Sequence, residues 1–104
     1  MKDGIINLDT IRGKKFSFTS DKYFGWLWKK GDYIIISFIE SKNKGKGNFS
    51  KLLNEIFKKG YQIKVPNPFP LMQLILKRRG FKKTYEYDKN FKEDVEIWVK
   101  EANK

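Results

Sequence analysis

The feature that most constrains this chain is an apolar run that leads through a glycine-rich turn into an amphipathic run. The apolar run spans Tyr33–Ile39 and is interrupted only by Ser37. A short apolar stretch bounded by turn residues predicts a central strand that is covered on both faces. The segment that follows, ESKNKGKGNFSKLL from Glu40 to Leu53, contains Gly45 and Gly47.

A helix is predicted directly after these glycines. Apolar residues recur there at helical spacing, namely Phe49, Leu52, Leu53, Ile56 and Phe57. Asn48 is the expected N-cap, and Lys58, Lys59 and Gly60 form a basic, glycine-ended stop. The segment therefore reads as strand, loop and helix.

The remaining segments complete a mixed sheet. Strands are predicted in KKFSFTS, in the two halves of YFGWLWKKGDYIIISFIE, in YQIKV and in a closing hairpin around residues 88–90. The first dozen residues are also compatible with a short strand. A second helix is expected from Pro70 to Arg79, ended by Gly80. The predicted order is β-β-β-α-β-α-β-β, an α/β (α+β) chain with one mixed sheet, in a single domain over residues 1–104.

Composition limits the chemistry. The chain has 23 Lys and Arg against 12 Asp and Glu, a formal charge of +11, which attracts phosphates, although a lysine-rich surface bias explains the charge equally well. There is no Cys and no His, so thiolate, imidazole and Cys/His zinc chemistry are excluded and no metal site is predicted. No stretch is apolar enough to span a bilayer, so we expect a cytoplasmic protein.

The glycine loop is suited to an anion. The first amides of a helix have no intrahelical partner, the helix dipole is positive there, and glycine permits both close approach and positive φ. The Walker A pattern is absent. The dinucleotide pattern GxGxxG also fails, because Gly45 and Gly47 are followed by Ser50 where a third glycine is required.

A third pattern does fit. Lys42-Asn43-Lys44-Gly45-Lys46-Gly47 resembles the Gln/Arg-x-x-Gly-x-Gly/Ala loop of the GNAT superfamily of acyl-CoA-dependent N-acyltransferases. An apolar strand precedes this loop, a helix follows it, and RRGF at the end of the second helix resembles the family's turn into its closing hairpin. The resemblance covers about Phe24 to Val99.

The resemblance implies an acetyl-CoA site. In this family the loop-bearing strand and the next strand separate, and the pantetheine arm lies in the gap. The backbone of Ser37, Phe38 and Ile39 would pair with that arm, and Asn67 would contact it. Pyrophosphate would lie on the amides of Lys44, Gly45, Lys46, Gly47, Asn48 and Phe49, with Lys42 or Lys46 reaching the 3′-phosphate.

The implied reaction is direct attack of an amine on the thioester in a ternary complex. Glu40 is the candidate base, and a solvated strand-end charge is the alternative interpretation. The position of the family's usual acid Tyr is occupied here by Leu76, which cannot donate a proton. Tyr85 or Tyr87 is a candidate substitute, with core packing as the alternative role.

The sequence predicts no counterpart of the family's usual N-terminal helix pair. An open acceptor side favours a macromolecular amine such as a protein lysine, and short basic domains of this kind resemble those encoded by phages and mobile elements. We therefore expect a host defence nucleoprotein, such as a CRISPR effector, as a candidate acceptor. The alternative is a non-catalytic GNAT-like basic module that binds nucleic acid or a nucleoprotein.

Aromatic residues cluster before the central strand, at Tyr23, Phe24, Trp26 and Trp28. Packing in the core or on the sheet is the favoured interpretation, and stacking on bases is the alternative. Trp98, if exposed, would indicate a dimer interface or another partner contact.

Overall fold

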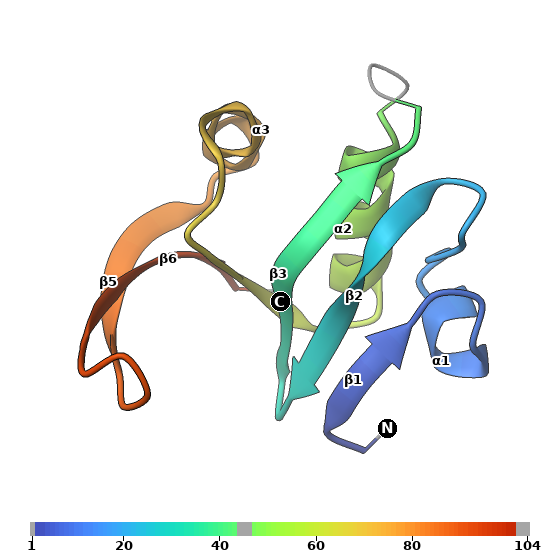
Figure 1. Cartoon of the computed structure of the whole chain (residues 1–104). Helices are drawn as coiled ribbons and strands as arrows, with labels where there is room; N and C mark the ends of the chain where they lie inside the picture. The colour runs from blue at the N-terminus through green and yellow to red at the C-terminus, as the bar shows by residue number, and fades with distance from the viewer. Residues whose placement is uncertain (1, 44–46, 102–104) are drawn as a thin grey trace.

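The computed structural model describes residues 2–43 and 47–101, which form an α+β fold with six strands in one mixed sheet and three short helices (Figure 1). The strands are β1 (Gly4–Asn7), β2 (Tyr23–Lys30), β3 (Tyr33–Ser41), β4 (Gln62–Pro66), β5 (Lys82–Asp88) and β6 (Glu93–Lys100). The helices are α1 (Ile11–Lys14), α2 (Asn48–Lys58) and α3 (Pro70–Arg78). The strand order is β1-β2-β3-β4-β6-β5, in which β3 and β4 are parallel and all other neighbours antiparallel.

Most predicted elements are confirmed. Strands β2 and β3 form a hairpin in which Lys30 lies opposite Tyr33, and Gly31 takes a positive φ of 58° in the turn. Strands β5 and β6 form the closing hairpin, and α3 begins at Pro70 as expected, whereas α2 begins at Asn48, one residue earlier than predicted. None of the helices in the described part of the chain has the length and hydrophobicity that a membrane span requires.

The strand predicted in KKFSFTS is wrong. Ser17 has a φ of 57°, and the N–H groups of Phe16 and Phe18 both donate to the Gly13 carbonyl, at 3.0 and 2.9 Å. This turn follows α1, which Thr10 caps by accepting the Gly13 N–H at 3.0 Å. The alternating phenylalanines are therefore two buried residues of one tight turn, and β1 supplies the third strand before α2.

The core lies between α2 and one face of the sheet. Its fully buried members come from the apolar stripe of α2 and from inward-facing strand positions, including Leu52, Leu53, Ile56, Leu27, Ile34, Ile36 and Ile63. Figure 1 shows α2 behind β2 and β3, on the side away from the viewer. The opposite face of these strands is not covered by the helices that the structure describes.

The prediction that the central strand is covered on both faces is therefore wrong. Ile34 and Ile36 are buried, whereas Phe38 is 45% exposed and Ser37 is also exposed. A β-bulge explains part of this pattern, because Trp28 pairs with Ile35 but Trp26 pairs with Phe38, which leaves one extra residue in β3. An apolar run can thus belong to a strand with one open face.

Candidate functional site

The two parallel strands separate part of the way along their length. They pair only at Tyr33 with Gln62, Ile34 with Ile63 and Ile35 with Lys64. Beyond this point β3 continues to Ser41 against β2, and β4 continues to Pro66 against β6. The carboxyl ends of the two strands therefore open a gap inside the sheet.

Local sequence explains the separation on the β4 side. Pro66 and Pro68 have no N–H to donate to a ladder, so β4 cannot extend its pairing with β3. Asn67 has a φ of 44°, and its N–H donates to the Glu96 carbonyl at 2.9 Å, which ties the end of β4 to β6. On the other side, the bulge in β3 changes the direction of that strand.

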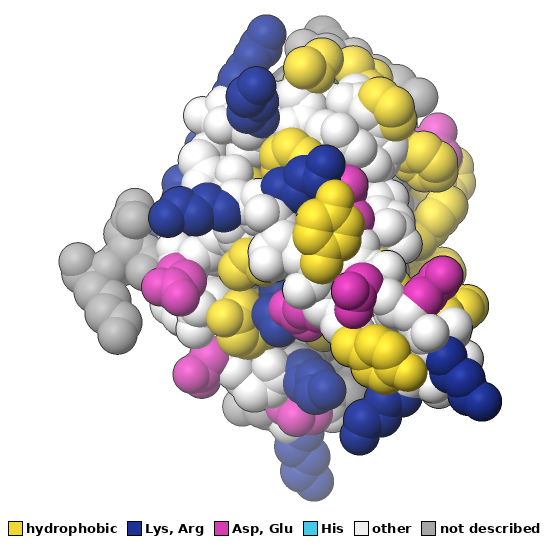
Figure 2. Space-filling model, turned by 90° about the vertical axis from the view of Figure 1, so that its left-hand side faces the viewer, with side chains coloured by type: hydrophobic (Ala, Val, Ile, Leu, Met, Phe, Trp, Pro, Cys, Tyr) yellow, Lys and Arg dark blue, Asp and Glu magenta, His cyan; other side chains and the backbone are white. Residues whose placement is uncertain are grey.

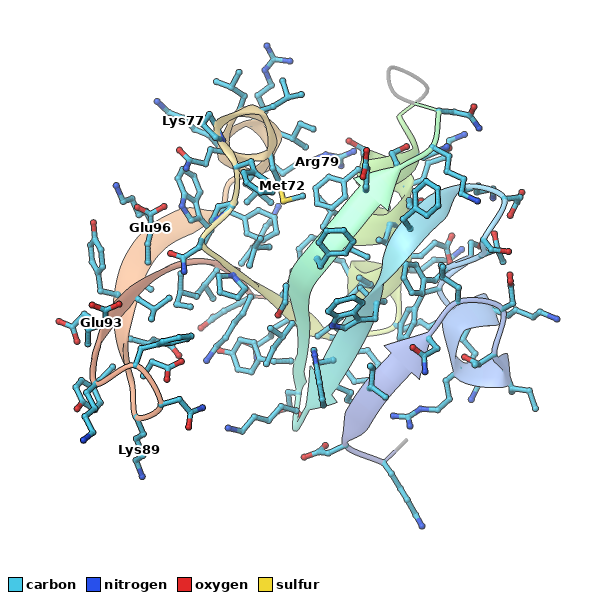
Figure 3. The ribbon with its side chains drawn as sticks, viewed as in Figure 1. Met72, Lys77, Arg79, Lys89, Glu93 and Glu96 are labelled. Carbon is cyan, nitrogen blue, oxygen red and sulfur yellow. The ribbon has the colours of Figure 1, made fainter. Side chains whose placement is uncertain are left out.

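The gap is a cleft with a volume of about 670 Å³, within the range of small-molecule sites. One wall is the end of β3, the other is the end of β4 with the start of α3, and the mouth lies at the start of α2. Figure 3 shows Met72 pointing from α3 toward β3. The lining residues are Ile36, Ser37, Phe38, Ile39, Glu40, Ser41, Gly47, Asn48, Phe49, Ser50, Val65, Pro66, Asn67, Pro68, Phe69, Leu71, Met72 and Ile75.

The N-terminus of α2 lies at one end of the cleft. Gly47 is the N-cap of α2 with a φ of 73°, and a Cβ on it would meet no atom of the described residues within 4 Å. The N–H groups of the following turn lack intrahelical acceptors by helix geometry and carry the positive end of the dipole. The predicted cap at Asn48 is wrong by one residue, because Asn48 is already helical and no side chain caps α2.

A buried tyrosine fixes the start of α2. The Tyr23 hydroxyl donates to the Asn48 carbonyl, and Tyr23 is only 2% exposed. Burial, helped by the charge of Asp21, raises the pKa of Tyr23 to about 12. The hydroxyl therefore stays protonated, and stays a donor, at any physiological pH.

Replacing Tyr23 by phenylalanine should lower the free energy of unfolding by about 1 kcal/mol, because one buried hydrogen bond is lost. The raised pKa adds a pH dependence. Stability due to the neutral phenol is complete below about pH 10 and is lost as the pH rises through about 12. Urea unfolding of both proteins should therefore give a difference that shrinks between pH 10 and 12. A constant difference would contradict the assignment.

The structure brings most of the predicted site residues together. Eight of them line the cleft, namely Ser37, Phe38, Ile39, Glu40, Gly47, Asn48, Phe49 and Asn67. Three more, Lys44, Gly45 and Lys46, lie outside the described residues. Sequence reasoning missed the α3 wall, although Met72 and Ile75 show the helical spacing that could have indicated it.

Three predicted positions lie elsewhere. Lys42 does not line the cleft, since its Nζ lies 4.4 Å from the ring centroid of Phe24. Tyr85 is 59% exposed on β5, with β6 between it and β4, so it is not positioned as an acid for a reaction in the cleft. Leu76 is fully buried in the core rather than facing the cleft.

Polar groups at the cleft are few. Among many apolar side chains, the polar ones that line the cleft are Ser37, Glu40, Ser41, Asn48, Ser50 and Asn67. The Ser41 hydroxyl is buried and has no hydrogen-bond partner within the described part of the chain. A buried hydroxyl in that state is expected to bond to a molecule that enters the cleft.

Trp98 does not provide the exposed surface that would have indicated a dimer. It is 8% exposed, and its Nε1 donates to the Glu96 carboxylate at 3.0 Å. Comparison of the chain with protein-family models, with curated proteins and with solved structures gives no match.

Proposed function

We propose that this chain is a GNAT-type N-acetyltransferase that uses acetyl-CoA. The observation that carries the proposal is the parting of β3 and β4 after Ile35, which leaves a cleft that ends at Gly47 and the start of α2. An extended pantetheine arm needs a strand edge to bond to, and a pyrophosphate needs a helix N-terminus. Both lie along one continuous cleft.

Each part of the cofactor has a proposed partner. The pantetheine amides bond to the β3 backbone at residues 37–39, which β4 no longer reaches. The pyrophosphate lies on the amides that follow Gly47, and Asn67 contacts the arm from the opposite wall. Apolar side chains of α3, among them Met72 and Ile75, cover the arm and exclude water.

The proposed chemistry is a single displacement. The amine nitrogen attacks the thioester carbonyl carbon, the new C–N bond forms, and the C–S bond breaks to release the thiolate of CoA. Glu40 at the end of β3 accepts the amine proton, directly or through water. With Tyr85 and Leu76 outside the cleft, water supplies the proton that the thiolate takes up.

Isothermal titration of the purified protein with acetyl-CoA tests the cofactor. We expect micromolar binding, weaker binding of pantetheine, which has no phosphate, and weaker binding of adenosine 3′,5′-bisphosphate, which cannot fill the cleft. Absence of heat with acetyl-CoA at millimolar concentration would overturn the proposed function.

Replacing Glu40 by glutamine should lower kcat by about 10²- to 10⁴-fold, with little change in acetyl-CoA affinity, because an amide cannot accept the amine proton. The assay is transfer from radiolabelled acetyl-CoA to a lysine-rich peptide across a range of pH. Glu93, which Figure 3 shows at the far end of the β5–β6 hairpin, supplies the control substitution Glu93→Gln. Equal rates for both variants would show that the base is elsewhere.

We infer a macromolecular acceptor, namely a protein lysine. Supporting this, the face of β1, β2 and β3 is not covered by the described helices, so the side of the cleft near Phe38 is open to a large partner. A host defence nucleoprotein of the CRISPR type is the candidate target if the protein comes from a phage or mobile element. Mass spectrometry of an RNA-guided nuclease incubated with the protein and acetyl-CoA tests this, and an unmodified, fully active nuclease contradicts it.

A further inference from the structure

A second surface, which adjoins the cleft at Phe38, lies on the uncovered face of β1, β2 and β3. Four aromatic side chains there are exposed by more than a third, and we call them the aromatic platform: Phe24 (51%), Trp26 (38%), Trp28 (42%) and Phe38 (45%). The favoured interpretation from the sequence is packing in the core or on the sheet: Tyr23 lies in the core, whereas Phe24, Trp26 and Trp28 lie on the sheet face and stay partly exposed. A continuous exposed patch of large apolar groups on a small protein indicates a partner.

Strand register places the platform side chains on one face. Phe24, Trp26 and Trp28 are two residues apart on β2, so they point the same way. Trp26 lies opposite Phe38, and their rings stack with centroids 5.3 Å apart at an angle of 27°. Trp28 lies opposite both Ile5 and Ile35, which extends the apolar surface across three strands. Figure 3 shows rings gathered in front of β2 and β3.

The same surface can be followed in a second view. Figure 2 turns the molecule so that the side nearest β5 and β6 faces the reader, and hydrophobic side chains gather along its right-hand edge. Across the middle of that view, basic and acidic side chains are interspersed. Other hydrophobic side chains are visible away from this edge, so exposed apolar groups are not limited to the platform.

Lysines lie at both ends of the platform. At one end the Nζ of Lys42 is 4.4 Å from the ring centroid of Phe24. At the other end Lys30 is exposed opposite Tyr33, and the Nζ of Lys64 is 4.4 Å from the Tyr33 ring centroid. Acidic groups are also present, since Glu40 lies opposite Phe24 and Glu86 pairs with Lys64 at 3.0 Å.

The positive net charge of the chain indicates which kind of partner fits the platform. The chain carries a formal charge of +11, so a second copy laid on this face would bring the same excess charge and be repelled. A partner that combines flat apolar groups with negative charge matches both the rings and the lysines. Single-stranded nucleic acid has this chemistry, because every base has a π-face and every linkage a phosphate.

We propose that the aromatic platform binds single-stranded nucleic acid. Bases stack on Trp26 and Trp28, while phosphates lie toward Lys42 at one end and Lys30 at the other. The seven residues from Phe24 to Lys30 span about 20 Å of strand, enough for about six nucleotides at the stacking repeat of 3.4 Å. This site does not require CoA, so nucleic-acid binding can be tested independently of the proposed acetyl transfer.

Fluorescence anisotropy with labelled twelve-nucleotide oligo(dT) and oligo(rU), without CoA, tests the proposal. Trp26→Ala and Trp28→Ala should each weaken binding by about 5- to 150-fold, the range reported for losing one stacking ring. Phe91 provides the matched control, because it is a 72% exposed ring in the β5–β6 turn, away from the platform. Phe91→Ala should leave the affinity unchanged, and the ratio of the two oligomers shows whether DNA or RNA is preferred.

Two further measurements make the result decisive. Lys42→Gln should reduce the slope of log affinity against log salt by about 0.7, the value for one phosphate contact on a single strand. Oligonucleotide should also quench tryptophan fluorescence, mainly from the exposed pair, because Trp98 is buried. This quenching remains measurable if an alanine variant does not fold.

Several outcomes would overturn the proposal. Equal affinity for the single strand and its duplex, with no effect of Trp26→Ala, would show that lysines alone bind the phosphates. The same conclusion follows if Trp26→Ala and Phe91→Ala behave alike. Binding of polyglutamate but not of oligonucleotide would replace nucleic acid with an acidic protein as the occupant of the platform.

Discussion

Replacing Gly25 by alanine is expected to destabilise the protein by about 4 kcal/mol or more, which is exceptional for adding one methyl group. Gly25 has a φ of 117° in the middle of β2, and a Cβ built on it lies 2.1 Å from the Phe38 carbonyl oxygen. No real Cβ comes that close to a backbone atom, so β2 and β3 must separate at this point. The end of β3 forms one wall of the cleft, and β2 and β3 together carry the side chains of the platform.

A second glycine makes this test specific. Gly4 has a similar φ of 134°, yet a Cβ on it meets nothing within 4 Å, so Gly4→Ala carries the backbone strain without the collision. At about 4–8 °C per kcal/mol, Gly25→Ala should lower Tm by about 15–30 °C, and Gly4→Ala by much less. Calorimetry or circular dichroism measures both. Similar melting temperatures for the two variants would contradict the β2–β3 register described above.

Replacing Gly47 by glutamate is expected to abolish acetyl-CoA binding while leaving the protein folded. No described residue lies within 4 Å of a Cβ at Gly47, so those residues accommodate a side chain, which would bring a negative charge to the end of the cleft. A carboxylate there repels the pyrophosphate that we propose for the same amides. The titration that gives micromolar binding for the unaltered protein should give no measurable heat for this variant.

Gly60 supplies the matched control for this substitution. Gly60 follows the C-terminal end of α2 and has a φ of 88°. A Cβ built on it meets no described atom within 4 Å. Gly60→Glu therefore introduces the same charge and a similar left-handed strain of about 1–2 kcal/mol, away from the cleft. Both variants should lose similar stability, and only Gly47→Glu should lose the cofactor. Retained binding by Gly47→Glu would move the phosphate site away from this helix.

Local patterns were sufficient for much of the fold. The alternation in YQIKV and the proline and glycine at either end of α3 predicted these elements, because they depend on neighbours in the chain. The turn containing Ser17 was mispredicted because its local pattern does not distinguish a turn from a strand. Two phenylalanines with one polar residue between them form the same pattern in a strand and in a tight turn, and only the positive φ of Ser17 distinguishes them.

The candidate site was predictable in part. The loop and the end of β3 were expected from consecutive residues, and the structure places most of the described ones in one cleft. The α3 wall and the exposure of Trp26 and Trp28 depend on how distant elements pack. Whether a helix lies over a given face of the sheet is not encoded in the strand itself, so the platform became visible only in three dimensions.

The parting of β3 and β4 also means that the sheet contains two unfinished edges in its interior. Within residues 2–43 and 47–101, the only strand pairing that joins the three strands on one side to the three on the other is at Tyr33, Ile34 and Ile35. A molecule that bonds to both edges would act as a missing segment of strand and couple the two halves mechanically. Amide exchange in β6, which is not a neighbour of β3 in the strand order, should then slow when the gap is filled, so that binding in the cleft changes protection on both sides of the sheet.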